Sequence, residues 1–151
     1  MKKLLYLSIT AVFLLSPQTI AEKLIWSELP DLPPSPGRKV QPGLAGAFCG
    51  TSGESLIIAG GANFPERPFY SGGKKVFHRD IFVLSKDTDG EYSWHICDLK
   101  LPEPTAYGVS VSTSEGLVCI GGSTGKRHSK KCFILKINEN GTLITELLPP
   151  L

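Results

Sequence analysis

A phrase of six residues occurs twice in this chain of 151 residues, and the two copies are 61 positions apart. The first copy is 56–61 (LIIAGG) and the second is 117–122 (LVCIGG). Each copy is an apolar run of strand length that ends in a glycine pair. Because self-similarity at a fixed period is the signature of repeat architectures, the chain is restricted to folds built from copies of one unit.

The segments around the two phrases also correspond. Before each phrase lies a stretch of small residues, 43–49 (GLAGAFC) and 105–111 (TAYGVSV), in which we align Gly46 with Gly108. After each phrase come a polar loop, a strand, a turn and a last strand. These later elements are strand 80–84, turn 87–90 and strand 92–99 in the first unit, and strand 131–135, turn 138–141 and strand 142–148 in the second. No stretch after residue 21 has helical periodicity.

Four short antiparallel strands per unit, with a glycine pair ending the second strand, predict one blade of a β-propeller. The glycines suit a sharp turn out of a strand near the propeller axis, where a positive φ is useful. We therefore expect an all-β fold, a partial propeller with two four-stranded antiparallel blades at 43–104 and 105–151. Residues 22–42 would supply the outer strand of a closing blade, 24–29, and a proline-rich connection. Since propellers normally have about four to eight blades, we expect a piece of a longer propeller, or self-association through open blade faces.

The first 21 residues have the three parts of a secretory signal. Lys2 and Lys3 give a positive start, 4–15 is apolar, and Thr19 and Ala21 are small residues at the cleavage end. The apolar run is shorter than the roughly 20 residues that cross a bilayer. We expect cleavage near Ala21 and a periplasmic or secreted protein without membrane contact after cleavage. An uncleaved N-terminal anchor is the alternative.

The net charge argues against a nucleic-acid partner. Lysine and arginine total 16 and aspartate and glutamate total 14, but two of the lysines lie in the signal segment. The remainder carries no formal net charge, and it has no long-range field that would attract nucleic acid or an anionic membrane. We therefore expect neither as a partner.

The four cysteines include no CxxC pair, and the chain has only three histidines, so we expect no zinc site. The repeat places Cys119 where the first unit has Ile58, and Cys132 where it has Ile81. We interpret the cysteines as small buried apolar residues. Disulfide pairing in an oxidising compartment is the alternative.

Several phrases of the chain resemble one protein family. They are AGGANFP at 59–65, GGKK at 72–75, AYG at 106–108 and LVCIGGS at 117–123. Together they resemble the cyclically permuted mutarotase family, which is related to the N-acetylneuraminate epimerases, or sialic acid mutarotases. The resemblance covers nearly all of 24–148. It implies a kelch-type propeller, an exported isomerase acting on a sugar acid, and a chain that is incomplete and inactive by itself.

Mutarotation needs a base for the anomeric hydroxyl proton and an acid for the ring oxygen, and it needs no metal or organic cofactor. A sialic acid also carries a carboxylate, which suits a cationic side chain. The loop 62–79 has 18 residues, against 8 in the second unit, and function tends to lie on such loops. From it we take Glu66 as a candidate catalytic base. The candidate substrate-binding residues are Asn63, Arg67, Lys74 and, on the innermost strand of the second unit, Tyr107.

Each candidate also has a structural interpretation. The loop charges can be solvated, and Tyr107 can pack between blades. The basic run 126–131 (KRHSKK) is either a small anion-binding patch or a solvated loop. The alternative function is a non-catalytic kelch-type binding module for a glycan or a protein. No catalytic residue follows from the resemblance, and no metal ligand is expected.

Overall fold

The computed structural model of the protein describes residues 24–151, so the predicted signal segment lies outside the described residues. The regular structure in this part of the chain is strand, apart from one 3-10 turn, η1 (Phe69–Ser71). Within 24–151, no helix has the length and apolar character that crossing a membrane would require.

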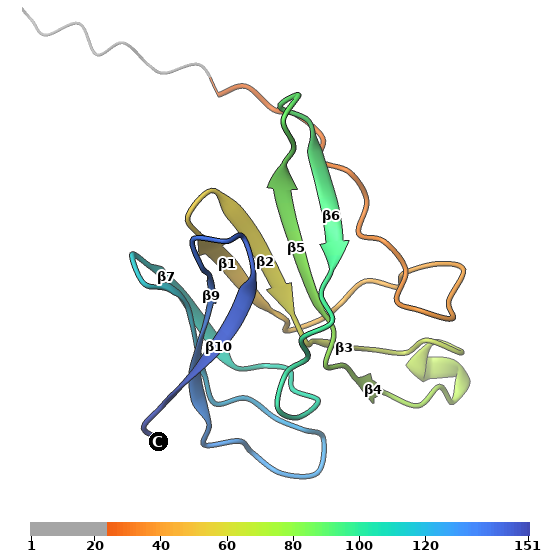
Figure 1. Ribbon diagram of the computed structural model, residues 1–151. Coiled ribbons are helices and arrows are strands. Elements are labelled where there is room, and N and C mark those ends of the chain that lie inside the picture. The colour runs from red at the N-terminus through yellow and green to blue at the C-terminus, as the bar shows by residue number, and fades with distance from the viewer. Residues whose placement is uncertain (1–23) are drawn as a thin grey trace, which may run out of the picture.

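Two four-stranded antiparallel sheets form the fold, the first yellow to green and the second cyan to blue in Figure 1. The first sheet has the order β1-β2-β5-β6 and the second has the order β10-β9-β8-β7. The strands are β1 (Phe48–Ser52), β2 (Ser55–Ala59), β5 (Ile81–Lys86), β6 (Tyr92–Ile96), β7 (Val109–Thr113), β8 (Gly116–Ile120), β9 (Cys132–Ile137) and β10 (Leu143–Leu148). The predicted pair of four-stranded antiparallel sheets is confirmed.

The long loop of the first unit is partly folded. Its ends pair as a short hairpin of β3 (Ala62–Asn63) and β4 (Val76–Phe77), with η1 between them. This hairpin projects from the end of the first sheet at which β2 stops and β5 begins (Figure 1). The loop therefore has a defined geometry and can hold side chains in fixed positions.

The two glycine pairs occupy equivalent places, as predicted. Gly60 and Gly61 have φ values of 69° and 92°, and Gly121 and Gly122 have 65° and 101°. The first glycine of each pair donates its N–H to the carbonyl of the residue preceding the third strand, at 2.9 Å in both units. Because this left-handed region favours glycine, the repeated GG marks the exit from the second strand of each blade.

The strand ladders correct one detail of the sequence alignment. Residues 48 and 109 pair with residues 59 and 120, so the offset of 61 continues through the first strands. Gly46 therefore corresponds to Tyr107, and the predicted match with Gly108 is wrong by one residue. The backbone agrees, because φ is 62° at Gly46 and 61° at Tyr107. Small residues on both sides of the two positions concealed this shift in the sequence.

The hydrophobic core lies between the two sheets. Its buried members are Phe48, Ile57, Ala59, Ile81 and Val83 from the first sheet, Leu117, Cys119, Phe133 and Leu135 from the second, and Leu101 from the connection. The rings of Phe48 and Phe133 meet edge to face, with centroids 5.7 Å apart. The stability of the pair of blades therefore depends on apolar burial across this seam.

The two sheets contribute unlike faces to this core. In β2 the fully buried side chains are Ile57 and Ala59, whereas in β8 they are Leu117 and Cys119. The counterparts of these β8 residues, 61 positions earlier, are the β2 side chains on the opposite face. Side chains alternate between the two faces of a strand. The first blade therefore contributes one of its faces to the core, and the second blade contributes the opposite face.

The structure contains four free thiols. Cys119 and Cys132 are buried, as the repeat predicts, and burial raises the pKa of Cys119 to about 12. Cys97 is half-buried and Cys49 is exposed. The expectation of a buried cysteine is thus wrong for Cys49, because its side chain lies on the face of β1 that points away from the core.

The segment 24–29 forms no strand in the structure. The side chains of Leu24, Ile25 and Trp26 are largely exposed. The chain after it is attached to the first sheet, since Trp94 Nε1 donates to the Pro30 carbonyl at 2.7 Å. The predicted outer strand therefore finds no partner strand within the described part of the chain.

Candidate functional site

The candidate site lies at the seam between the blades, at the end where the glycine pairs and the β3–β4 hairpin are found (Figure 1). Three backbone hydrogen bonds connect the units there, one of them from the Thr105 N–H to the His78 carbonyl at 3.1 Å. The Tyr107 N–H donates to the Gly46 carbonyl at 2.7 Å, and the Gly61 N–H donates to the Thr105 carbonyl at 2.8 Å. These hydrogen bonds hold the backbones of the two blades together at the seam, so side chains from both blades have fixed relative positions there.

A lysine from the hairpin meets aromatic side chains at this seam. Lys75 Nζ donates to Tyr107 Oη at 3.0 Å and lies 5.0 Å from the centroid of the same ring. It also lies 5.5 Å from the centroid of the Phe64 ring, and Phe77 meets Tyr107 edge to face at 6.2 Å. A cation within about 6 Å of an aromatic face is attracted to it. We call Phe64, Lys75, Phe77 and Tyr107 the lysine–aromatic cluster.

Tyr107 is held in a strained backbone conformation. Among the described residues it is the one non-glycine residue with a positive φ, at 61°. The left-handed region costs a residue with a side chain about 1–2 kcal/mol, and observed outliers of this kind cluster at functional sites. The ring lies close over Gly46, where an added Cβ would come 2.4 Å from Tyr107 Cδ1. The strained backbone therefore holds a tyrosine whose side chain stays accessible, since Tyr107 is 49% exposed.

Asn63 joins the hairpin to the preceding connection. His78 Nε2–H donates to Asn63 Oδ1 at 2.9 Å, and Asn63 Nδ2 donates to the Pro42 carbonyl at 3.5 Å. Burial lowers the pKa of His78, and the positive charge of Arg38 lowers it further, against a smaller opposite effect of Asp80. Asn63 is buried and both ends of its amide are occupied, so its clearest role is to position the hairpin.

The other loop candidates lie on the exposed part of the hairpin. Within the described chain, the side chains of Glu66, Arg67 and Lys74 make no hydrogen bond or ion pair, and all three are exposed. The lysine that contacts Tyr107 is Lys75, which is not among the residues predicted from the sequence. Lys75 lies two residues before Phe77, and side chains two apart on an extended segment share a face, so the pairing of β3 with β4 directs Lys75 toward Tyr107.

A depression of about 540 Å³ adjoins Tyr107. It is bordered by the second glycine pair, Ser123 and His128, so hydroxyl and imidazole groups from the second blade face the same space as the phenol. Ligand pockets commonly have volumes of about 300–1,000 Å³ and a few convergent polar groups. Tyr107 is the member of the lysine–aromatic cluster that borders this depression, whose other lining residues also come from the second blade.

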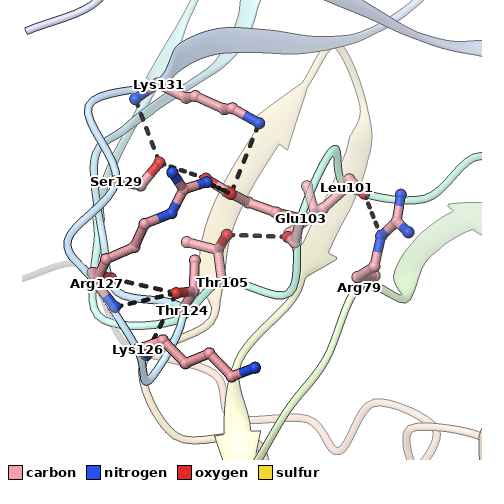
Figure 2. A network of polar contacts seen from close by, with 9 residues as sticks. All are labelled: Arg79, Leu101, Glu103, Thr105, Thr124, Lys126, Arg127, Ser129 and Lys131. Carbon is pink, nitrogen blue, oxygen red and sulfur yellow. Dashed lines mark hydrogen bonds and ion pairs between the residues drawn. The ribbon is translucent and has the colours of Figure 1, made fainter.

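The basic run 126–131 is engaged with Glu103, as Figure 2 shows. The carboxylate of Glu103 accepts from Arg127 at 2.7 Å and from Ser129 Oγ at 2.8 Å, and Lys131 Nζ lies 3.7 Å away. Two cations of the run, Arg127 and Lys131, therefore share the single negative charge of Glu103. The structure favours a structural role for this loop over a free anion-binding patch.

The neighbours Arg79 and Asp80 bind different partners and form no salt bridge with each other. Arg79 Nε donates to the Leu101 carbonyl at 2.6 Å (Figure 2). Asp80 instead pairs with Lys100 at 3.1 Å and accepts a hydrogen bond from Ser35 Oγ at 2.7 Å. Both residues therefore attach the connecting segments to the first blade, and neither contacts the lysine–aromatic cluster.

The Glu103 network makes stability depend on pH. The hydrogen bond from Ser129 lowers the pKa of Glu103, and Arg127 and Lys131 add to this against the opposing effect of burial. A carboxyl group whose pKa is lowered by folding stabilises the fold fully above its unfolded pKa, about 4.3 for glutamate, and loses that contribution as the pH falls through the folded pKa.

We therefore expect Glu103→Gln to lower the free energy of unfolding at pH 7, and the difference from the parent protein to shrink below about pH 4. Urea denaturation at a series of pH values measures it. Ser129→Ala, which removes the first donor, should reduce the same pH dependence in part. An undiminished difference at pH 3 would show that Glu103 acts through packing instead.

The solved structure of YjhT matches this chain with a TM-score of 0.63 and 26% sequence identity. The match covers 84% of this chain and 36% of the YjhT chain. The two sheets are thus blades of a partial kelch-type β-propeller, as predicted from the repeat and the resemblance.

The family follows from sequence similarity. The family model of N-acetylneuraminate epimerase matches residues 14–144, and the chain belongs to that family. It is 37% identical to the N-acetylneuraminate epimerase of Salmonella arizonae over 131 residues, which are 83% of this chain and 33% of the relative. Identity is 42% with the Salmonella typhi enzyme and 34% with that of Yersinia enterocolitica, over 70% and 71% of this chain and 28% of each relative. The chain spans about a third of the length of these relatives.

Proposed function

We propose that this chain serves the epimerisation of N-acetylneuraminate, and that its lysine–aromatic cluster holds the carboxylate of the sugar acid. Family membership supports the reaction class. The observation that carries the assignment to this seam is the contact between Lys75 Nζ and Tyr107 Oη, which joins the two blades beside an open depression.

The chemistry of the cluster suits a sugar acid. Lys75 Nζ has three protons, one of which is used by Tyr107, so two are free for a carboxylate. Tyr107 Oη accepts from the lysine and keeps its own proton for a sugar oxygen. Charge-assisted hydrogen bonds of this kind are roughly twice as strong as neutral ones. The cluster can therefore bind and orient the substrate while the ring opens and closes.

The proton-transfer groups are not assigned within this cluster. In residues 24–151, no carboxylate forms a hydrogen bond or an ion pair with Lys75 or Tyr107. Glu66 is exposed on the same hairpin and stays a candidate base. We also propose that the protein acts in the periplasm or outside the cell, on the evidence of the signal-like start of the sequence.

A chimera tests the proposed function. Residues 24–148 would replace the matching segment of the Salmonella typhi enzyme, and exchange between the anomers of N-acetylneuraminate would be followed by proton NMR. We expect exchange faster than in buffer, reduced about tenfold or more by Lys75→Met and little affected by Lys74→Met. A folded chimera that binds the sugar without faster exchange would instead support the non-catalytic binding module. For this chain by itself we expect binding without faster exchange.

A further inference from the structure

The loop 123–130 of the second blade lies against the lysine–aromatic cluster. Gly125 is at the tip of this loop, and an added Cβ there would come 2.5 Å from Phe77 Cε2, 2.9 Å from Phe77 Cδ2 and 3.2 Å from Phe77 Cζ. The three nearest atoms thus belong to one ring. Phe77 in turn meets Tyr107 edge to face, with ring centroids 6.2 Å apart. The second blade therefore contacts the cluster through this loop as well as through Tyr107.

The tip of the loop has a defined backbone conformation. The Thr124 N–H donates to the Arg127 carbonyl at 3.0 Å, which makes Gly125 and Lys126 the two central residues of a tight turn. Gly125 has a φ of 81°, as is typical of turns with glycine at the first central position. Its N–H also donates to Ser123 Oγ at 3.1 Å. The glycine therefore serves the turn, and its lack of a side chain lets the tip approach the ring.

The backbone is held on both sides of this contact. On the loop, Arg127 and Ser129 donate to the carboxylate of Glu103 at 2.7 and 2.8 Å (Figure 2). On the hairpin, Phe77 pairs with Ala62 in the ladder between β3 and β4. Because neither backbone can withdraw easily, a methyl group added at position 125 would displace the ring of Phe77.

A displaced Phe77 ring would alter the geometry of the proposed site. The edge-to-face arrangement is a preferred geometry of aromatic pairs, so Phe77 helps to fix the ring of Tyr107. Lys75 Nζ lies 5.0 Å from the centroid of that same ring and donates to its hydroxyl. The position of the ammonium group therefore depends on the position of the phenol.

We propose that Gly125 is a positioning residue of the sugar-acid site and acts by holding the Phe77 ring against Tyr107. This inference rests on the function proposed for the lysine–aromatic cluster, but the contact can also be tested without the sugar. It gives the loop 123–130 a role besides its ion pairs with Glu103, because the loop makes the geometry of a hairpin on the first blade depend on the second blade.

The test compares two glycine substitutions. Gly125→Ala introduces the methyl group at the ring. Gly141→Ala is the matched control, because Gly141 has a φ of 74° in a turn of the same blade and a Cβ there would meet nothing within 4 Å among the described residues. Phe77→Leu removes the outer ring atoms and supplies a background without the contact. Circular dichroism establishes that each variant is folded, and Gly125→Asn is the substitute if Gly125→Ala is not, since asparagine adopts a positive φ more readily.

The first measurement is the NMR signal of the Tyr107 ring without sugar, because ring signals depend on neighbouring aromatic rings. We expect Gly125→Ala to shift this signal and Gly141→Ala to leave it unchanged. In the Phe77→Leu background, adding Gly125→Ala should cause no further shift. An unchanged Tyr107 signal in Gly125→Ala, or a shift of the same size in the Phe77→Leu background, would overturn the proposal.

The second measurement is the affinity for N-acetylneuraminate, obtained by NMR titration of the same proteins. Gly125→Ala should weaken binding about 2- to 10-fold, and Gly141→Ala should not change it. In the Phe77→Leu background the effect of Gly125→Ala should disappear. A shifted Tyr107 signal with unchanged affinity would also overturn the proposal. A parent chain that does not bind the sugar would contradict the proposed function, and the Tyr107 signal would still decide whether Gly125 positions the cluster.

Discussion

Phe48→Ala will lower the free energy of unfolding by about 3–5 kcal/mol. Phe48 has no exposed surface, and its ring packs against Phe133 from the other blade. The ring also lies close to Gly108, where an added Cβ would come 2.4 Å from Phe48 Cε1. The ring is fully buried against the second blade, so truncation leaves a cavity at the interface.

The matched control for this change is Phe69→Ala. Phe69 is 71% exposed on the turn within the long loop, and surface substitutions usually change stability by less than about 0.5 kcal/mol. Urea denaturation followed by far-ultraviolet circular dichroism measures both variants. Equal effects of the two changes would mean that the seam between the blades is not the core of the fold.

Gly60→Ala will destabilise the protein by more than about 3 kcal/mol. Gly60 has a φ of 69°, and a Cβ there would lie 2.3 Å from the Thr105 carbonyl oxygen and 2.7 Å from Leu101 Cδ1. The substitution therefore adds a steric clash with the connection between the blades to the cost of a left-handed alanine. The carbonyl cannot move away easily, because it accepts the Gly61 N–H.

Gly90→Ala separates the clash from the backbone strain. Gly90 has a φ of 86° in the turn between β5 and β6, and a Cβ there would meet nothing within 4 Å. We expect only the conformational cost of about 1–2 kcal/mol at this position. If the thermal and urea midpoints of the two variants agree, the glycine pair serves backbone conformation alone and the close approach has no energetic weight.

The repeat made most of the fold predictable. An apolar phrase ending in a glycine pair, repeated after 61 residues, specified two equivalent sheets and the position of the sharp turns. It failed at the first strand of each unit, where Gly46 corresponds to Tyr107. A glycine and a tyrosine share one left-handed conformation there, and only the strand ladders reveal the correspondence.

The site was predictable only in part. Loop length indicates residues 62–79, and the expected innermost strand of the second unit indicates Tyr107, which in the structure lies just before β7. The choice between Lys74 and Lys75 depends on the pairing of β3 with β4 inside that loop, which a polar sequence without a strong strand pattern does not indicate. Asn63 was selected for substrate contact, but it binds His78 and Pro42, because the hairpin brings together segments distant in sequence.

The most direct test of the proposed site is the affinity of N-acetylneuraminate for this chain and two variants, Lys74→Met and Lys75→Met, measured by NMR titration. The two lysines are neighbours and lose the same charge, but only Lys75 contacts Tyr107. Loss of a charge-assisted hydrogen bond costs about 1.5–3 kcal/mol, so Lys75→Met should weaken binding about 10- to 100-fold and Lys74→Met about twofold or less. The methyl ester of the sugar, which lacks the negative charge, should bind as weakly to the parent chain as the acid binds to Lys75→Met. Equal affinities of the two variants for the acid would contradict the assignment of the lysine–aromatic cluster as the sugar-acid site.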